Sequence, residues 1–282
     1  MQSLKFSAST NVGLHRDNNE DSFLSLPERG LWVVADGMGG HEAGEVASAI
    51  VRETLEQAGS EIELVASLQN SHKAVVEAAN AGIGAQGMGS TVVALSSKQH
   101  DYQVAWVGDS RAYLWTKNDN GGQLEQLSVD HSYVQMLLAS GSIDESDLDS
   151  HPDKNIITQC IGWQELDEVT VDTIKGTWKK NQWILLCSDG LNDEVDDTEI
   201  ARIMSCAKKT TDAVELLIKA ALEGGGHDNI TIQVIESPLT KRAPLSRLAA
   251  WIPNISGHTG IDTVLFSTSA ISLLLLGYWL LN

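Results

Sequence analysis

The chain has 282 residues, of which 42% are hydrophobic, and this suits one large domain or one domain followed by a tail. Its formal net charge of -19 argues against a nucleic-acid-binding protein, because such a protein needs a basic face. The three cysteines are odd in number and widely spaced, which indicates reduced thiols in a cytosolic domain and not a disulfide framework or a zinc site. The N-terminus has no apolar signal-peptide core.

The first half of the chain predicts two groups of strands separated by helices. Apolar runs indicate strands at residues 4–10, 23–26, 31–35, 92–96, 102–107 and 112–115. Apolar residues at helical spacing indicate helices at residues 41–57 and 61–81. The last two strands are joined so closely that they pair antiparallel, which argues against a doubly wound parallel sheet.

The second half predicts strands at residues 169–174, 183–187 and 230–235, and helices at 133–139, 197–206 and 211–222. Asp130, His131 and Ser132 precede the first of these helices, where Asp and Ser are good caps. The acidic segment 141–155 is either a flap beside a site or an ordinary surface loop. The order of elements predicts an α+β fold, a two-sheet antiparallel β-sandwich flanked by α-helices in four αββα layers.

The C-terminus carries an uncharged run of 18 residues at 264–281. As a helix it spans roughly 27 Å, close to the ~30 Å hydrocarbon thickness of a bilayer. Two interpretations of this segment are possible, a buried C-terminal helix and a transmembrane tail anchor. We expect the anchor, because the segment is apolar all round at its end and follows a linker that contains Pro and Gly.

Basic residues lie only on the N-terminal side of this run, at Lys241, Arg242 and Arg247. With Asp262 they give the tail a charge of +2 and leave -21 on residues 1–236. The positive-inside rule then places the main domain in the cytoplasm. We therefore expect a main domain at 1–236, a linker at 237–262 and a single-pass anchor of the inner (cytoplasmic) membrane at 263–282.

Acidic residues recur where strands begin or end, each beside Gly, Ser or Asn. They are Glu20, Asp21, Asp36, Asp109, Asp189 and Asp228. One such Asp is typical of a turn, and residues 15–23 alone also fit a solvated loop. Six of them predict a cation site, because bunched carboxylates repel one another unless cations neutralise them. Carboxylate and carbonyl oxygens suit magnesium or manganese.

Two such ions bridged by a shared carboxylate would generate hydroxide near neutral pH. That hydroxide would attack phosphorus in line, while the planar fork of Arg16 holds the phosphoryl oxygens. A cysteine phosphatase is excluded, since the residues six positions after the three cysteines are Leu166, Asp193 and Asp212, and none is Arg. The sequence also contains no Gly-x-x-x-x-Gly-Lys-[Ser/Thr] loop and no Gly-x-Ser-x-Gly elbow.

Residues ~5–236 resemble the metal-dependent Ser/Thr protein phosphatases (PPM, type 2C) in their bacterial form. Each motif that carries the resemblance is weak alone, but all six in order are very specific. They are Arg16-x-x-Asn19-Glu20-Asp21-Ser22, Val34-Ala35-Asp36-Gly37-Met38-Gly39-Gly40-His41 with Gly44-Glu45, Gly87-Met88-Gly89-Ser90-Thr91, Val107-Gly108-Asp109-Ser110-Arg111, Leu186-Cys187-Ser188-Asp189-Gly190-Leu191 and Asp228-Asn229-Ile230-Thr231.

The resemblance implies a ligand set for two Mn²⁺ or Mg²⁺ ions. Asp36 would bridge both ions, and the Gly37 carbonyl would join one of them. Asp189 and Asp228 would complete the other. Asp109, together with Asp189, would hold a weaker third ion.

The resemblance also implies roles for the residues around the ions. Glu20 and Asp21 would orient metal-bound waters, and Arg16 would bind the substrate phosphate. Asn229 would support the site from behind the ligands. The flap would be segment 141–155.

One position departs from many eukaryotic relatives, which have a histidine, proposed as the general acid, directly after Asp-Gly. Here that residue is Met38. His41 follows three residues later, where capping or packing is at least as good an interpretation as catalysis. We therefore expect a metal-bound water to protonate the leaving Ser or Thr oxygen.

These observations predict a membrane-tethered Mg/Mn-dependent phosphatase of phosphoserine and phosphothreonine in proteins, which antagonises a Ser/Thr kinase. Two alternatives remain open: a catalytically silent, membrane-anchored module that binds phosphoproteins, and a phosphatase of small phosphomonoesters. The partners predicted are phosphoprotein substrates, a Ser/Thr kinase and the membrane, and the net charge argues against nucleic acid.

Overall fold

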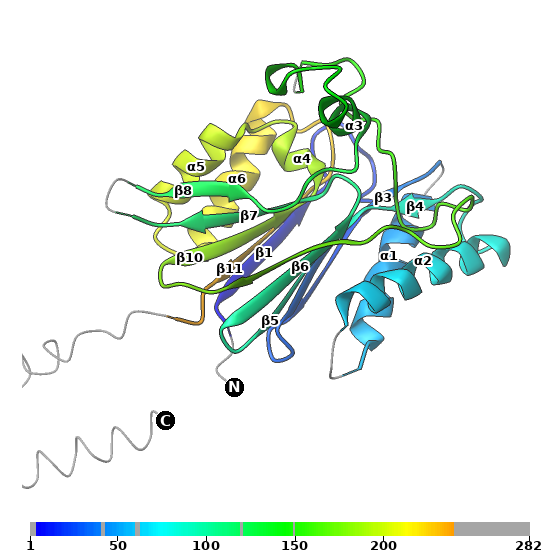
Figure 1. Cartoon of the computed structure of the whole chain (residues 1–282), viewed down its shortest axis with the longest axis horizontal. Helices are drawn as coiled ribbons and strands as arrows, with labels where there is room; N and C mark the ends of the chain where they lie inside the picture. The colour runs from blue at the N-terminus through cyan, green and yellow to red at the C-terminus, as the bar shows by residue number, and fades with distance from the viewer. Residues whose placement is uncertain (1–3, 41–42, 60–62, 119–120, 149, 240–282) are drawn as a thin grey trace, which may run out of the picture. The chain divides into compact units, whose positions relative to one another are not determined.

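Two antiparallel sheets stack face to face in the computed structural model, which describes residues 4–40, 43–59, 63–118, 121–148 and 150–239 (Figure 1). The first sheet has the order β1 (Phe6–Asn11), β11 (Ile230–Glu236), β10 (Gln182–Cys187), β7 (Arg111–Thr116), β8 (Gln123–Gln126). The second has the order β2 (Asp21–Leu26), β3 (Leu31–Met38), β5 (Val92–Lys98), β6 (Asp101–Val107), β9 (Asp172–Thr177), and β4 (Gly89–Ser90) pairs with β3. The predicted α+β fold with two antiparallel sheets is confirmed.

The space between the sheets is filled by large apolar side chains, among them Trp32, Val34, Leu95, Trp106, Ile184 and Leu186. Alternate residues of β3 face opposite ways. Trp32 and Val34 point to the other sheet, whereas Leu31, Val33 and Ala35 pack under helices. Both faces of this strand are buried, which explains why its sequence is a continuous apolar run and not an alternation.

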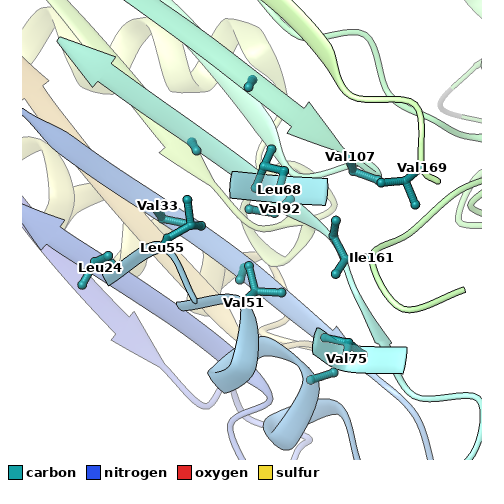
Figure 2. Packing of buried hydrophobic residues seen from close by; sticks show 14 of the residues in the cluster. Leu24, Val33, Val51, Leu55, Leu68, Val75, Val92, Val107, Ile161 and Val169 are labelled. Atoms are coloured by element: carbon teal, nitrogen blue, oxygen red, sulfur yellow. The ribbon is translucent and has the colours of Figure 1, made fainter. Parts of the chain in front are cut away.

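Helices α1 (Ala43–Gln57) and α2 (Leu64–Asn80) cover the outer face of the sheet that contains β3. Figure 2 shows this layer, in which Val51 and Leu55 of α1 and Leu68 of α2 lie against Val33 and Val92 of the sheet. The outer face of the other sheet packs against α4 (Asp189–Asn192), α5 (Asp197–Cys206) and α6 (Thr210–Gly224). The order helix, sheet, sheet, helix is the predicted four-layer arrangement.

The connection between β8 and β9 carries α3 (Tyr133–Ala139) and a short 3-10 helix, η1 (Glu145–Asp147). The predicted helix 133–139 is confirmed, and its N-cap is Ser132, whose side chain accepts a hydrogen bond from the Gln135 N–H. Asp130 and His131 have other partners, described below. All three cysteines are free, as expected.

Strands 102–107 and 112–115 were expected to pair with each other, which was wrong. They are β6 and β7, and the turn at 108–110 crosses from one sheet to the other, so β6 pairs with β5 and β9, and β7 pairs with β10 and β8.

Several predicted boundaries were also wrong. The strand expected at 169–174 is β9, three residues later, because Val169 is buried under the layer formed by α1 and α2 and Thr170 N–H binds the Gln159 side chain. The edge strand β8 was missed, since Gln123–Gln126 contains one apolar residue. The strand expected to end at Ala35 continues to Met38, so Asp36 lies inside the strand and not at its end.

The predicted tail anchor, residues 263–282, lies outside the described residues, as does the linker from residue 240. Within the part of the chain that the structure describes, no helix is both long and apolar enough to cross a membrane.

A buried glutamine links the two sheets. Gln233 of β11 is fully buried, and its Nε2 donates to the carbonyl oxygens of Val33 (2.6 Å) and Leu24 (3.2 Å) in the other sheet. Its Oε1 accepts a hydrogen bond from Ser25 Oγ at 2.6 Å. The side chain therefore satisfies polar groups on both neighbouring strands of the opposite sheet.

We predict that Gln233→Leu lowers the free energy of unfolding by about 2–3 kcal/mol, because it leaves the buried partners of the amide without hydrogen bonds. Denaturant unfolding measures the change. Gln123→Leu, on the exposed edge strand β8, is the matched control and should stay within about 0.5 kcal/mol of the parent. Equal losses in the two variants would contradict the assigned role of Gln233.

Candidate metal centre

Two carboxylates lie directly opposite each other on neighbouring strands. The register of β2 and β3 pairs Asp21 with Asp36. Like charges in such a pair destabilise a sheet unless something compensates them. Ser188 Oγ donates to Asp21 Oδ2 at 2.8 Å, but Asp21 Oδ1 is buried and has no hydrogen-bond partner among the described residues. The pair thus contains one buried oxygen atom, Asp21 Oδ1, that no described residue satisfies.

Asp189 joins this pair from the other sheet. It follows β10 at the start of α4, and its carboxyl is close enough to that of Asp36 for a hydrogen bond between the two. Burial raises the pKa of Asp36 well above its usual range, and the charges of Asp21 and Asp189 add to that rise. Burial also raises the pKa of Asp189, and Asp189 Oδ1 has no partner among the described residues.

Asp109 is the fourth carboxyl of this group and, like Asp36 and Asp189, is half-buried. Burial raises its pKa to about 7, and nearby Asp130 adds to the rise. The pKa of Asp21 is raised to about 6, again chiefly by burial, although hydrogen bonds from Thr231 and Ser188 oppose the rise. The charge of Asp109 in turn raises the pKa values of Asp36 and Asp189. The four groups are therefore held in mutual electrostatic repulsion.

Asp228 lies at the same end of the molecule but faces an arginine. Its Oδ2 accepts a hydrogen bond from Arg16 Nη2 at 2.6 Å, and its Oδ1 accepts one from the Asn229 N–H at 2.7 Å. Its charge raises the pKa values of Asp189 and Asp21. The structure thus brings the predicted phosphate-binding residue into contact with a predicted metal ligand.

Asn229 fixes the loop that carries Arg16 and Glu20. Its Nδ2 donates to the carbonyls of Val12 (2.8 Å) and Asn18 (3.0 Å), and its Oδ1 accepts from the Glu20 N–H at 2.7 Å. Glu20 itself is half-buried, and burial raises its pKa while Arg16 opposes the rise. The side chain of Asn229 therefore ties the loop before β2 to the loop before β11.

Gly37 allows the start of α1 to touch the strand that carries Asp36. A Cβ atom on Gly37 would lie 2.0 Å from the Gly44 carbonyl oxygen, and one on Gly44 would lie 2.8 Å from Glu20 Oε2. Ser48 Oγ, one turn further along α1, donates to the Glu20 carbonyl at 2.6 Å. Only glycine fits at both positions. Gly37 and Gly44 together therefore allow the backbone of α1 to approach the backbone of β3 closely.

Sequence reasoning did not assign Ser188, Ser48 or Glu194 to the site. Ser188 precedes Asp189 in the Ser-Asp-Gly motif, which is the signal that would have found it. Glu194 Oε1 accepts from both the backbone N–H (3.1 Å) and Nδ1 (2.6 Å) of His227, whose ring stacks on His15. These two bonds hold the turn before Asp228.

Met38 is half-buried and pairs in register with Gly89 of β4. His41, the alternative proton donor considered above, lies outside the described residues. The segment predicted as a flap borders a cleft of about 700 Å³ that also has Asp109 and Asp189 in its wall. Its end is fastened where Lys154 Nζ (3.2 Å) and Asn155 Nδ2 (3.1 Å) bind the carboxylate of Asp193.

The donor set fits a hard divalent cation that keeps water ligands. Among the described residues, no three His, Cys, Asp or Glu side chains are arranged to hold an ion by themselves. The buried, unpartnered oxygens of Asp21 and Asp189 nevertheless lie in a group of acids whose pKa values are raised by burial and by neighbouring negative charges. A bound cation would offset both effects. Mg²⁺ and similar ions are held by one or two carboxylates and several waters, which matches this arrangement.

Comparison with known proteins agrees with the fold. The family profile of protein phosphatase 2C matches residues 1–135. The serine/threonine phosphatase Stp of Listeria monocytogenes is 36% identical over 247 residues, which covers 83% of this chain and 96% of that protein. The crystal structure of the Mycobacterium tuberculosis serine/threonine phosphatase PstP/Ppp has a TM-score of 0.73 at 33% identity and covers 83% of this chain and 98% of that one.

A further structure, the catalytic domain of the phosphatase PstP in complex with two manganese ions, has a TM-score of 0.70 at 32% identity over 83% of this chain and 98% of that one. The chain therefore belongs to the protein phosphatase 2C family, the metal-dependent protein serine/threonine phosphatases, which use Mn²⁺ or Mg²⁺. The family that the six motifs predicted is confirmed, and so is its cofactor.

We predict that the metal-free protein loses stability as the pH rises from 5 to 8. The pKa of Asp109 is about 7 in the folded state and roughly 4 in an unfolded chain. A raised carboxyl pKa stabilises the fold fully below the unfolded value, and this stability is lost as the pH rises through the folded pKa. Mn²⁺ replaces protons as the neutralising charge, so the gain in Tm on adding Mn²⁺ should be larger at pH 8 than at pH 5.

Thermal unfolding of the EDTA-treated and Mn-loaded protein at both pH values measures this effect. Asp109→Asn removes one titrating carboxyl and should flatten the pH dependence of the metal-free Tm. Asp17→Asn, at an exposed position, is the control and should leave it unchanged. A metal-free Tm that rises from pH 5 to pH 8 in the parent but not in Asp109→Asn would contradict the prediction.

Proposed function

We propose that this protein hydrolyses phosphoserine and phosphothreonine in proteins at a centre of two Mn²⁺ or Mg²⁺ ions. The observation that carries the proposal is the meeting of Asp36 and Asp189, which come from different sheets yet share one buried position with raised pKa values. Such a pair is stable with both carboxyl groups ionised only when cations lie between or beside them. When bound, the ions supply a hydroxide near neutral pH and offset the charge of the phosphoryl oxygens.

The residues of the chain hold the ligands in place. Asp36 would be the shared ligand, and the Gly37 carbonyl, Asp189 and Asp228 would add further oxygens. Asp109 with Asp189 would hold the weaker third ion. Regular elements anchor two of these carboxylates, since Asp36 lies within β3 and Asp189 begins a helix.

Glu20 and Asp21 orient the water molecules of the centre, and Asn229 fixes the loop that carries Glu20. Arg16 binds the phosphate of the substrate. In the structure its guanidinium is paired with Asp228, so it is held at the edge of the acid group by one carboxylate. A phosphoryl group offers the same fork a second set of oxygens, and the bidentate geometry favours that exchange.

We predict that Asp36→Asn lowers kcat on a phosphothreonine peptide by at least ~10³-fold, because the shared carboxylate is lost. EDTA should abolish hydrolysis by the parent, and Mn²⁺ should restore it. Asp17→Asn, an exposed acid near the same loop, should keep full activity. Hydrolysis that survives EDTA or Asp36→Asn would refute the proposal.

The same assay separates the alternatives. A silent phosphoprotein-binding module would bind Mn²⁺ in calorimetry without turnover of any phosphopeptide. A phosphatase of small phosphomonoesters would hydrolyse metabolites at rates comparable with those for phosphopeptides. We favour the protein substrate, because the cleft of about 700 Å³ beside Asp109 and Asp189 has room for a peptide and not only for a small ester.

We propose further that residues 263–282 anchor the protein in the cytoplasmic membrane, behind a linker at 237–262. The support is the uncharged run 264–281, with Lys241, Arg242 and Arg247 on its N-terminal side. Tethering would raise the local concentration of membrane-bound phosphoproteins, and a Ser/Thr kinase that produces them is the natural counterpart.

We predict that a chain of residues 1–240 is soluble and active, whereas the full-length protein sediments with membranes and needs detergent for release. Fractionation followed by the phosphopeptide assay measures both properties. Full-length protein found entirely in the soluble fraction without detergent would show that there is no anchor.

A further inference from the structure

We propose that His131 is a positioning residue, which holds the turn that carries Asp109 and thereby sets the affinity of the metal site to which Asp109 contributes. The inference rests on the proposed function, in which Asp109 is a ligand of the weaker ion. It concerns a histidine that sequence reasoning treated only as part of a helix cap.

His131 forms hydrogen bonds with both backbone polar groups of Gly108. The Gly108 N–H donates to Nδ1 of the His131 ring at 3.1 Å, and the His131 backbone N–H donates to the Gly108 carbonyl at 2.9 Å. Gln159 Nε2 donates to the same Nδ1 at 2.9 Å. With two donors directed at Nδ1, that nitrogen is an acceptor, and the ring proton is on Nε2, 3.3 Å from Asp172 Oδ2.

The turn on the other side of Asp109 is held by the residue before His131. The Asp130 carboxylate accepts hydrogen bonds from Arg111 Nε (2.9 Å) and Nη2 (2.7 Å). Two consecutive residues, Asp130 and His131, therefore fix the residues two after and one before Asp109. Gly108 has φ +103°, and a Cβ there would lie 2.6 Å from Thr91 Cβ, so the turn has little freedom to adopt another form.

This clamp acts against electrostatic repulsion. The carboxyl of Asp109 lies close enough to those of Asp36 and Asp189 for its negative charge to raise the pKa of both. A freely moving turn would carry Asp109 away from the other acids when no cation is bound. Holding the turn keeps the carboxylate where the ion needs it, so less reorganisation opposes binding.

The chain contains a matched control in His72. This ring is also buried, its Nδ1 accepts from the Gly162 N–H at 3.1 Å, and its Nε2 lies 3.0 Å from the Leu166 carbonyl. His72 belongs to α2, in the layer outside the sheet, and its partners are not in the acid group. Substitution of His72 therefore reports the general cost of losing a buried, hydrogen-bonded imidazole.

The test compares His131→Asn with His131→Gln in the full-length protein. The Asn side chain places an oxygen near the position of Nδ1 and can still accept from Gly108, whereas Gln places its oxygen nearer the position of Nε2. Titration calorimetry of metal-stripped protein with Mn²⁺ measures the affinities of the sites, and the activity at varied Mn²⁺ is measured alongside.

We expect His131→Gln to weaken the lowest-affinity Mn²⁺ site by at least ~10-fold, the range found when partners of metal ligands are removed. The tighter sites should keep their affinities. His131→Asn should stay within about threefold of the parent, and His72→Gln should lower the Tm without shifting the Mn²⁺ isotherm. An unshifted isotherm in a folded His131→Gln, an equal shift in His72→Gln, or no difference between Asn and Gln would overturn the inference.

A second comparison distinguishes a failure of the inference about His131 from a failure of the proposed metal ligands. In the Asp109→Asn background, His131→Gln should have no further effect on Mn²⁺ binding, because the group that it positions is gone. If Asp109→Asn alone leaves the isotherm unchanged, Asp109 is no ligand, and the ligand assignment fails together with the inference. If Asp109→Asn shifts the isotherm but His131→Gln does not, only the inference about His131 fails. Should His131→Gln not fold, His131→Leu, which offers no acceptor, replaces it with the same expectation.

Discussion

Repulsion among buried carboxylates is the constraint around which this molecule is built. Asp21 and Asp36 are directly opposed across two strands, and Asp189 and Asp109 join them, all with pKa values raised by burial. Without compensating charge this group opposes folding at neutral pH. The surrounding structure must therefore supply stability elsewhere, and a divalent cation supplies the missing positive charge. Metal binding and stability are thus linked through the same oxygen atoms.

Rigid elements hold the acids against that repulsion. Three layers of buried apolar side chains fasten the strands from which the acids project. Gln233 joins one sheet to the other, and Asn229 ties the loop of Arg16 and Glu20 to the strand after Asp228. Around Asp109 the same task falls to Asp130 and His131. The groups that fix the site are therefore the neutral amides of Gln233 and Asn229, the imidazole of His131, and the ion pair that Asp130 forms with Arg111.

Much of the fold could be read from local pattern. The helices at 133–139 and 197–206 begin and end where predicted, and most strands lie within a few residues of their expected bounds. The failures have physical causes. Edge strand β8 is polar and has no periodic signal. Val169 and Val171 are apolar because they pack under α1 and α2 instead of joining the sheet. Asp36 was expected after its strand, but pairing with β2 and β4 extends the strand through it.

The sequence by itself determined the family, through six motifs in a fixed order. It also marked the acids as candidate ligands, because an acid beside Gly, Ser or Asn at the end of an apolar run is a pattern of neighbouring residues. Only the tertiary structure decided which acids meet, since Asp36 and Asp189 are far apart in the chain and approach through the stacking of two sheets. It also decided that Asp228 pairs with Arg16, and that His131 accepts a hydrogen bond from Gly108 instead of capping a helix. Those partners are set by packing between distant parts of the chain, and such packing produces no periodic pattern in the sequence.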